Sequence, residues 1–178
     1  MRISVERMRL ADLDDVMRIE RESYPTPWRE ETFRYEVVEN PNAYYVVARA
    51  DLPEGTFSIG FAGMWIICDE AHITTVAVDP EFRGLKVGER LLLDLLLAAT
   101  KRGALRATLE VRESNLVAQR LYFKYRFDAV GMRRRYYTDT GENAIIMWIE
   151  NLHDPALQRF MAERQRCLEE QPIALAGR

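Results

Sequence analysis

A glycine-containing junction between an apolar segment and a leucine-rich helix is the strongest chemical signal in the sequence. The chain is apolar from Thr75 to Val78 and then breaks at Pro80. Gly84 and Gly88 follow before the leucines begin. The first N–H groups of a helix have no partner within it, peptide dipoles place partial positive charge there, and glycine lets a ligand approach closely. The junction therefore predicts a phosphate-binding site, with an ordinary strand-to-helix turn as the alternative.

Two other phosphate-binding motifs do not fit this junction. A nucleoside triphosphate loop needs Gly-Lys-Ser/Thr at the helix start, whereas Glu89 and Arg90 follow Gly88 here. No hydroxyl therefore stands where such a loop would hold magnesium. The G-x-G-x-x-G fingerprint of dinucleotide-binding folds is also absent. We expect this junction to bind its ligand without a metal ion.

Two further segments carry side chains that suit a binding pocket. The segment from Tyr24 to Trp28 combines two prolines with two large aromatic residues. Such a segment is typical of a pocket wall, or of a packed corner between two helices. The basic run Arg133–Arg135 indicates either a solvated strand face or a site that attracts an acidic peptide or RNA.

The hydrophobic pattern predicts the elements that must position these residues. Period-two or β-branched runs predict strands at residues 3–10, 43–50, 56–68, 71–78, 105–111, 127–137 and 143–150. Helices are predicted to begin at Asp12, near Thr26 with Pro27 in the first turn, at Gly88, at a Ser114 cap, and near His153. The resulting order is βααβββαβαββ, an α/β (α+β) arrangement on one mostly antiparallel sheet, plus a C-terminal helix.

Composition limits the class of protein. A chain of 178 residues suits one domain, and its net charge of -3 argues against bulk nucleic-acid binding. No signal peptide is apparent, and the longest apolar stretch, Leu91–Ala99, is far shorter than the roughly 20 residues of a membrane span. We therefore expect a soluble, cytoplasmic protein without membrane contact. Cys68 and Cys167 show no pairing pattern and the two histidines no ligand spacing, so no disulfide and no metal are expected.

Three motifs in this order of elements carry a family resemblance. They are Val76–Val78 before the glycine loop, Leu109–Arg112 after it, and Ser114–Ala118 leading to Leu121-Tyr122. Together they resemble the GNAT superfamily of acetyl-CoA-dependent N-acetyltransferases over residues 1–150. The Arg135–Met147 segment looks like the ribosomal-protein alanine N-acetyltransferases, which acetylate the N-terminal alanine of a small-subunit ribosomal protein. Residues 151–178 would then be an added amphipathic helix and tail, packed on its own domain or on a partner subunit.

The sequence departs from the GNAT pattern at two glycines. Lys86 replaces the middle glycine of the family's Arg/Gln-x-x-Gly-x-Gly loop, and Arg126 replaces a glycine just before Phe127. A left-handed backbone would cost Lys86 roughly 1 kcal/mol more than glycine, whereas a helical backbone would cost it nothing.

The resemblance implies a role for each candidate residue. Acetyl-CoA would lay its pyrophosphate on the loop backbone and its pantetheine arm along the strand edge. The implied cofactor-binding residues are Val76, Ala77, Val78, Arg83, Gly84, Leu85, Lys86, Val87, Gly88, Glu89 and Asn115. Asn115 has an alternative role near the helix cap. The acceptor side would be lined by Trp28, Tyr136 and Tyr137.

The resemblance also implies Glu110 as general base and Tyr122 as general acid. From spacing alone, Glu110 would face solvent while Leu109 and Val111 share the other face, and Tyr122 would be a core aromatic residue. The family's general base aligns with Glu110. A phenol with a pKa of about 10 can protonate a departing thiolate whose conjugate acid has a pKa of about 8.5. A strand N–H near Val76–Val78 would polarise the acetyl carbonyl.

These residues together predict an enzyme that moves the acetyl group of acetyl-CoA to a protein N-terminal α-amine, above all an alanine of a ribosomal protein. The α-amine is the easier acceptor because its pKa is about 7.7–8.0, against about 10.4 for lysine. One alternative is the same chemistry on a lysine side chain or small amine. Another is a non-catalytic ribosome- or RNA-associated module, against which the acidic net charge argues. The C-terminal helix could also carry a homodimer contact.

Overall fold

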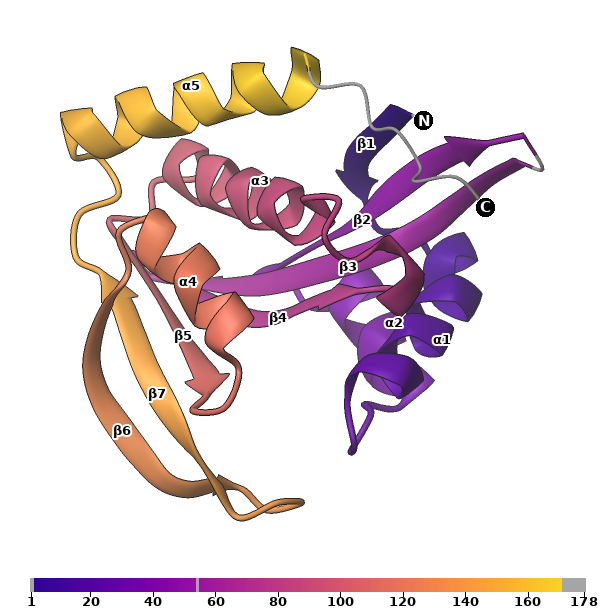
Figure 1. The fold of residues 1–178 in the computed structure, drawn as a ribbon, viewed down its shortest axis with the longest axis horizontal. Coiled ribbons are helices and arrows are strands. Elements are labelled where there is room, and N and C mark those ends of the chain that lie inside the picture. The colour runs from indigo at the N-terminus through magenta and orange to yellow at the C-terminus, as the bar shows by residue number, and fades with distance from the viewer. Residues whose placement is uncertain (1, 54, 171–178) are drawn as a thin grey trace.

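The computed structural model describes residues 2–53 and 55–170, which form one seven-stranded sheet with helices on both faces (Figure 1). The strands are β1 (Arg2–Arg7), β2 (Ala43–Leu52), β3 (Gly55–Ile67), β4 (Glu70–Val78), β5 (Arg106–Arg112), β6 (Asp128–Tyr137) and β7 (Glu142–Ile149). The helices are α1 (Leu13–Ser23), α2 (Glu30–Val38), α3 (Val87–Lys101), α4 (Leu116–Lys124) and α5 (Pro155–Glu170), with 3-10 turns η1 (Leu10–Asp12) and η2 (Pro80–Phe82). The predicted order of elements is confirmed.

The central strands of the sheet are buried on both faces. Successive side chains of a strand point to opposite sides, so in β2 Val46 and Ala48 enter one core while Tyr45 and Val47 enter the other. The helices α3, α4 and α5 lie over the first face, and α1 and α2 lie over the second (Figure 1). Two-sided burial explains why the central strands read as nearly continuous apolar runs.

The sheet opens between β4 and β5. Its order is β1-β2-β3-β4-β5-β7-β6, and every neighbouring pair is antiparallel except β4 and β5. These two strands pair only where Glu70, Ala71 and His72 meet Arg106–Thr108. Beyond this point both strands continue without pairing to each other. The edge of β4 from Ile73 to Val78 therefore faces an opening within the sheet.

The backbone is left-handed at both positions where the sequence departs from the GNAT glycines. Lys86 has a φ of 61° just before α3, and Arg126 has a φ of 63° just after α4. For Lys86 the costlier of the two alternatives, by roughly 1 kcal/mol, is thus the one observed. Gly84, with a φ of 79°, makes the other left-handed turn of this loop, which its lack of a Cβ permits.

The helix α2 begins later than the sequence predicts. The expected start near Thr26, with Pro27 in the first turn, is wrong, because α2 starts at Glu30. A proline disfavours helical backbone at the residue before it. The N–H of Trp28 also donates to a side-chain oxygen of Glu20, at 2.9 Å, and this bond fastens the segment onto α1.

The cap of α4 is shifted by one residue. Asn115, not Ser114, is the N-cap, since its Oδ1 accepts a hydrogen bond from the N–H of Ala118 at 3.1 Å. The N–H of Ser114 instead donates to Glu142 Oε1 at 2.7 Å, across to the β6–β7 hairpin. Local sequence would place Ser114 at the cap, but its N–H is instead bonded to the carboxylate of Glu142, which is distant in the sequence.

The helix α5 packs on its own domain, the first of the two alternatives in the sequence. Leu157, Met161 and Leu168 are buried in the core that contains α3. Phe160 meets the ring of Tyr125 at the end of α4 with centroids 5.3 Å apart. No helix within residues 2–53 and 55–170 is long and apolar enough to cross a membrane.

Glu89 joins α3, α4 and α5 through one buried carboxylate. Its Oε1 lies 2.6 Å from Lys124 Nζ and 2.9 Å from Arg164 Nε, and it accepts a hydrogen bond from the Tyr125 hydroxyl at 3.1 Å. Burial alone would raise the pKa of Glu89, but the bonds from Lys124 and Arg164 outweigh it and hold this pKa below its usual value.

We expect Glu89→Gln to lower the free energy of unfolding by about 2 kcal/mol near pH 7. Loss of one partner of a buried pair costs about 3–5 kcal/mol, and partly exposed cations recover some of this in water. A carboxyl group whose pKa is lower in the folded than in the unfolded protein stabilises the fold at pH values above its unfolded pKa. This stabilisation is lost as the pH falls through the folded pKa. Urea unfolding should therefore show a deficit that shrinks from pH 7 to pH 3. An equal deficit at both values would contradict this role.

Candidate active site

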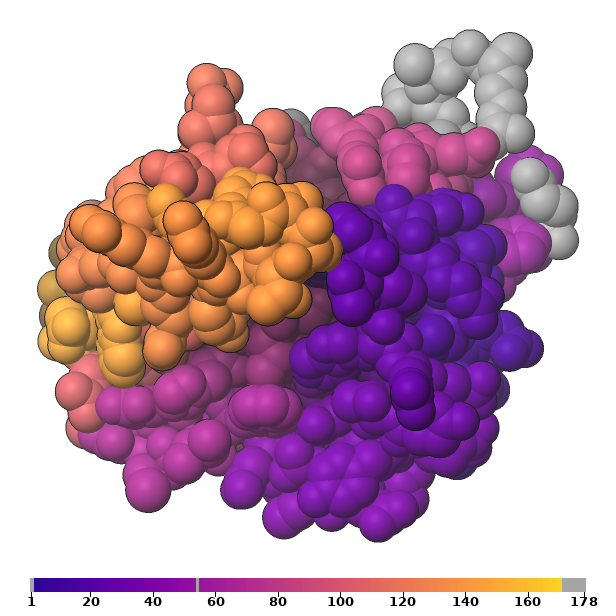
Figure 2. Space-filling model, turned by 90° about the horizontal axis from the view of Figure 1, so that it is seen from below, coloured from indigo at the N-terminus to yellow at the C-terminus, as the bar shows by residue number. Residues whose placement is uncertain are grey.

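The opening between β4 and β5 leads into a cavity of about 580 Å³, a size typical of ligand sites. Its walls come from the α1–α2 segment, from β4 and β5, and from the β6–β7 hairpin. The hairpin and the α1–α2 segment lie side by side with a recess between them (Figure 2). The sequence-predicted residues that line the cavity are Trp28, Val76, Glu110, Asn115, Tyr122, Tyr136 and Tyr137.

A larger cavity of about 1000 Å³ lies between β1, α3 and α5. None of the residues predicted for catalysis or acceptor binding lines it. Two of its charged side chains already bond within the chain: Arg90 donates to the carbonyl of Leu168, and Asp94 accepts from the Tyr44 hydroxyl at 3.1 Å. The cavity between β4 and β5 is therefore the better candidate site.

Glu110 faces this cavity from β5. Its neighbours Leu109 and Val111 are 2% and 4% exposed and point into the core, as their spacing predicts. The Glu110 side chain is 31% exposed, and its Oε1 lies 3.3 Å from Arg133 Nε on β6. The face that spacing alone would assign to solvent is thus the cavity wall, where a carboxylate can reach a ligand.

Tyr122 reaches the cavity from α4 while its ring stays buried. The ring packs edge-on against Phe127 with centroids 5.7 Å apart. Burial, followed by the neighbouring Tyr24 and Tyr137, raises the pKa of the Tyr122 phenol. This phenol therefore stays protonated at neutral pH and can donate a hydrogen bond into the cavity. The raised pKa also makes complete transfer of its proton less favourable than for an ordinary tyrosine.

Tyr24 fastens α1 to the open edge of β4, a role that the sequence does not reveal. Its hydroxyl donates to the carbonyl of Val76 at 3.1 Å and lies 3.1 Å from Thr75 Oγ1. Burial raises the pKa of the Tyr24 hydroxyl. The bond helps to fix the stretch of β4 along which a ligand would lie.

The remaining predicted cofactor-binding residues lie outside the cavity lining, farther along β4 and at the start of α3. They are Ala77, Val78, Arg83, Gly84, Leu85, Lys86, Val87, Gly88 and Glu89. The Glu89 side chain is committed to α4 and α5, so this residue can offer a ligand only its backbone. Arg83 Nε donates to the Val78 carbonyl at 3.2 Å.

Gly88 is not required by the packing of the chain itself. A Cβ atom built there would meet Val78 Cγ2 at 3.5 Å and Leu121 Cδ2 at 3.9 Å, which are ordinary contacts. Its position in the first turn of α3 places it among helix N–H groups that lack intrahelical partners. A glycine here leaves the backbone open to an external anion.

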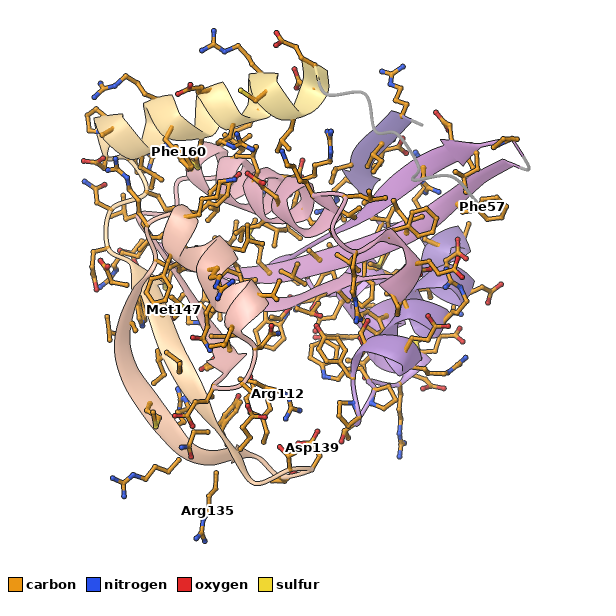
Figure 3. The ribbon with its side chains drawn as sticks, in the orientation of Figure 1. Phe57, Arg112, Arg135, Asp139, Met147 and Phe160 are labelled. Atoms are coloured by element: carbon orange, nitrogen blue, oxygen red, sulfur yellow. The ribbon has the colours of Figure 1, made fainter. Side chains whose placement is uncertain are left out.

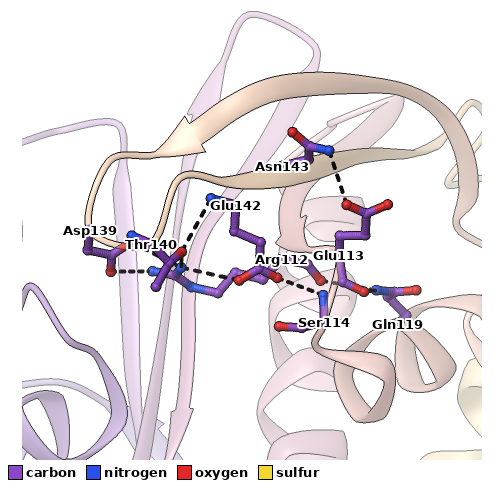
Figure 4. Close-up of polar contacts among 8 residues, drawn as sticks. All are labelled: Arg112, Glu113, Ser114, Gln119, Asp139, Thr140, Glu142 and Asn143. Atoms are coloured by element: carbon purple, nitrogen blue, oxygen red, sulfur yellow. Dashed lines mark hydrogen bonds and ion pairs between the residues drawn. The ribbon is translucent and has the colours of Figure 1, made fainter.

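Arg112 holds the hairpin over the cavity (Figure 4). Its Nη2 and Nη1 lie 2.7 and 3.1 Å from the two carboxylate oxygens of Asp139, and Nη1 also donates to Thr140 Oγ1 at 3.1 Å. Its guanidinium stacks 3.9 Å from the centroid of Tyr137. Arg112 and Asp139 lie together near the hairpin tip, whereas Arg135 points away from the protein (Figure 3). This network positions the aromatic pair at the cavity.

Glu20 is the main residue that sequence reasoning missed. It lies on α1, is 3% exposed, and lines the cavity beside Trp28. A signal was present, because Glu20 is four residues after Val16 and three after Met17, on the apolar stripe of the helix. A carboxylate at such a position is buried and needs a partner.

Comparisons with known proteins agree on one family. The sequence model of the "Acetyltransferase (GNAT) family" matches residues 13–127. The putative [ribosomal protein bS18]-alanine N-acetyltransferase of Bacillus subtilis (strain 168) is 43% identical over 146 residues, covering 82% of this chain and 94% of that protein. The [ribosomal protein bS18]-alanine N-acetyltransferase of Escherichia coli (strain K12) is 34% identical over 146 residues, covering 81% and 95%. The crystal structure of the ribosomal-protein-S18-alanine N-acetyltransferase from Escherichia coli matches with a TM-score of 0.72 and 31% identity, covering 83% of this chain and 93% of that one.

Proposed function

Since this chain belongs to the GNAT family of acetyltransferases, we propose that it transfers the acetyl group of acetyl-CoA to the N-terminal α-amine of a protein. The acceptor that we favour is the N-terminal alanine of a ribosomal protein, because relatives that align with most of the chain are named for that reaction. The observation that carries the proposal is that one cavity gathers Glu110, Tyr122 and the open edge of β4.

The described residues fit acetyl-CoA in two places. The backbone at the start of α3, from Gly84 to Glu89, would hold the pyrophosphate. The unpaired edge of β4 near Val76 would hold the amide-rich arm through main-chain hydrogen bonds, as an added strand does. When bound, acetyl-CoA supplies the acetyl group as an activated thioester.

The side chains then divide the proton transfers between them. Glu110 accepts a proton from the acceptor's α-ammonium, directly or through water, which leaves the nitrogen lone pair free. The Tyr122 hydroxyl donates a hydrogen bond to the leaving sulfur and gives it a proton, so that coenzyme A departs as the thiol. The second proton, which the nitrogen loses as the amide forms, passes to the phenol and restores it. A β4 N–H near Val76 would polarise the carbonyl.

The acceptor peptide would enter between Trp28 and the Tyr136–Tyr137 pair. These aromatic residues line the cavity from opposite segments of the chain. The rings of Tyr136 and Tyr137 pack edge to face with centroids 5.2 Å apart, and Arg112 covers Tyr137. Aromatic walls give a short apolar first residue a surface to pack against while its amine points inward.

A peptide with a free N-terminal alanine is expected to be acetylated at least about 100-fold faster than the same peptide blocked at that end and carrying internal lysines. The pKa values of the two kinds of amine differ by about two units or more, so far more of the α-amine is neutral near pH 7. Mass spectrometry after incubation with acetyl-CoA locates the modified nitrogen. Equal or faster modification of the blocked peptide would instead support a lysine or small-amine acetyltransferase.

Several expectations from the sequence stay predictions. They are the division into a catalytic domain of residues 1–150 and an added segment of residues 151–178, the homodimer, the lack of nucleic-acid binding and the cytoplasmic location. The packing of α5 bears on the domain division and on the homodimer. The buried apolar residues of α5 lie against α3 of the same chain, so α5 shares the core of residues 1–150 and those side chains are not exposed to a partner subunit.

A further inference from the structure

Glu20 has a buried carboxylate that is only half satisfied by the protein. Its Oε1 accepts the N–H of Trp28 at 2.9 Å. Its Oε2 is buried and has no hydrogen-bond partner among the described residues. Leaving a buried polar atom without a partner is costly, so a carboxylate retained here calls for a donor that the described residues do not supply.

The position of Glu20 shows where that donor would come from. Glu20 lies one helical turn before Tyr24, whose hydroxyl bonds to Val76 on the open β4 edge. It therefore faces, from α1, the same cavity that Glu110 faces from β5. The backbone bond to Trp28 fixes the carboxylate beside one aromatic wall of the acceptor side.

The described residues around Glu20 supply no positive charge to pair with it. Arg112, which lines the same cavity, is held by both oxygens of Asp139, and His72 lies against Glu70 at 3.1 Å. Burial raises the pKa of the Glu20 carboxyl, and the hydrogen bond from Trp28 opposes that rise. A cation that enters the cavity would relieve this penalty.

We infer that Glu20 binds the N-terminal ammonium of the acceptor peptide, in an inference that rests on the proposed function. An ammonium has three N–H donors and one positive charge. It can therefore give one hydrogen bond to Glu20 Oε2 and still present a proton to Glu110. Glu20 selects and positions the α-amine beside Trp28, and Glu110 deprotonates it. The class of ligand recognised is a primary ammonium.

Two matched peptides test this assignment. One begins with alanine, and in the other a propionyl group replaces the alanyl residue, so that only the α-amine is missing. We expect calorimetry with full-length protein saturated with coenzyme A to show tighter binding of the alanine peptide. Glu20→Gln should reduce that preference about 10-fold, as the loss of one charge-assisted hydrogen bond implies, and leave the propionyl peptide unaffected.

Glu36→Gln is the matched control. Glu36 is another buried carboxylate under the sheet, 6% exposed, but its Oε2 accepts bonds from Trp65 Nε1 and Asn40 Nδ2, each at 2.8 Å. It does not line the cavity. This variant should keep the preference for the alanine peptide.

In turnover, Glu20→Gln should raise KM for the peptide about 10-fold and leave KM for acetyl-CoA unchanged.

Each other outcome has a definite meaning. If Glu20→Gln weakens the binding of both peptides equally, Glu20 only holds the Trp28 segment in place and the inference is wrong. If it changes neither, the carboxyl binds no ammonium and the inference is equally wrong. A wild-type protein that acetylates the alanine peptide without preferring it in binding overturns the inference alone. A wild-type protein that fails to acetylate it overturns the proposed function as well.

Discussion

Replacement of Glu110 by glutamine is expected to lower kcat about 100-fold near pH 7 and to leave acetyl-CoA affinity within about twofold. The amide keeps the size of the side chain on β5 but cannot accept a proton from the acceptor. The loss should shrink as pH rises above about 8, because the α-amine is then neutral without help from a base. Steady-state kinetics with an alanine-starting peptide between pH 6.5 and 9.5 measure both effects.

Glu70→Gln is the control for this experiment. The Glu70 side chain is 26% exposed and pairs with Arg106 at 3.0 Å, much as Glu110 pairs with Arg133. It lies at the closed end of β4, outside the cavity lining, so its variant should keep wild-type kcat. If Glu110→Gln also turns over at the wild-type rate near pH 7, Glu110 is not the base.

The ion pair between Glu110 and Arg133 does not prevent this role. The Arg133 side chain is 55% exposed, and exposed pairs contribute only about 0–1 kcal/mol. An incoming ammonium can therefore replace the guanidinium beside the carboxylate. Of the basic run Arg133–Arg135, Arg133 thus pairs with a carboxylate of the cavity wall, and Arg135 points away from the protein (Figure 3).

The sequence predicts the elements well because most of them depend on local pattern. The apolar runs around Val46 in β2 and Phe61 in β3 are continuous because both faces of those strands are covered. Leucines three and four apart mark the buried side of α3. Gly103, with a φ of 85°, ends α3 as a C-cap glycine should. Such features need only a few neighbouring residues, so one sequence is enough to find them.

The details that the sequence does not predict depend on contacts between distant residues. Arg112 and Asp139 are 27 positions apart, and neither one alone indicates that the hairpin is tied to β5. The segment just before α2 is held against α1 by a bond from Trp28 back to Glu20. The residues Glu20 and Glu110 share a cavity only because β4 and β5 separate after three paired positions on each strand. These relations become visible only when the sheet is assembled.

Gly88 offers the clearest separation of cofactor binding from folding. A side chain fits there without displacing its neighbours, because the nearest atom to a Cβ is 3.5 Å away. Its position in the first turn of α3 also suits an acidic residue, since a negative charge near a helix N-terminus stabilises by about 0.3–1 kcal/mol. An aspartate at this position should therefore not weaken the fold.

We expect Gly88→Asp to reduce acetyl-CoA affinity about 100-fold while the melting temperature stays the same or rises slightly. A carboxylate about 5 Å from a phosphate charge costs about 3 kcal/mol at an effective dielectric constant of about 20, which corresponds to roughly that factor. Gly88→Asn has nearly the same shape without the charge, so it isolates the steric part and should lose far less affinity. Calorimetry gives the affinities and thermal unfolding gives the stabilities. If Gly88→Asp binds acetyl-CoA as tightly as the wild type, the pyrophosphate does not lie at the start of α3, and the site must be placed elsewhere along β4.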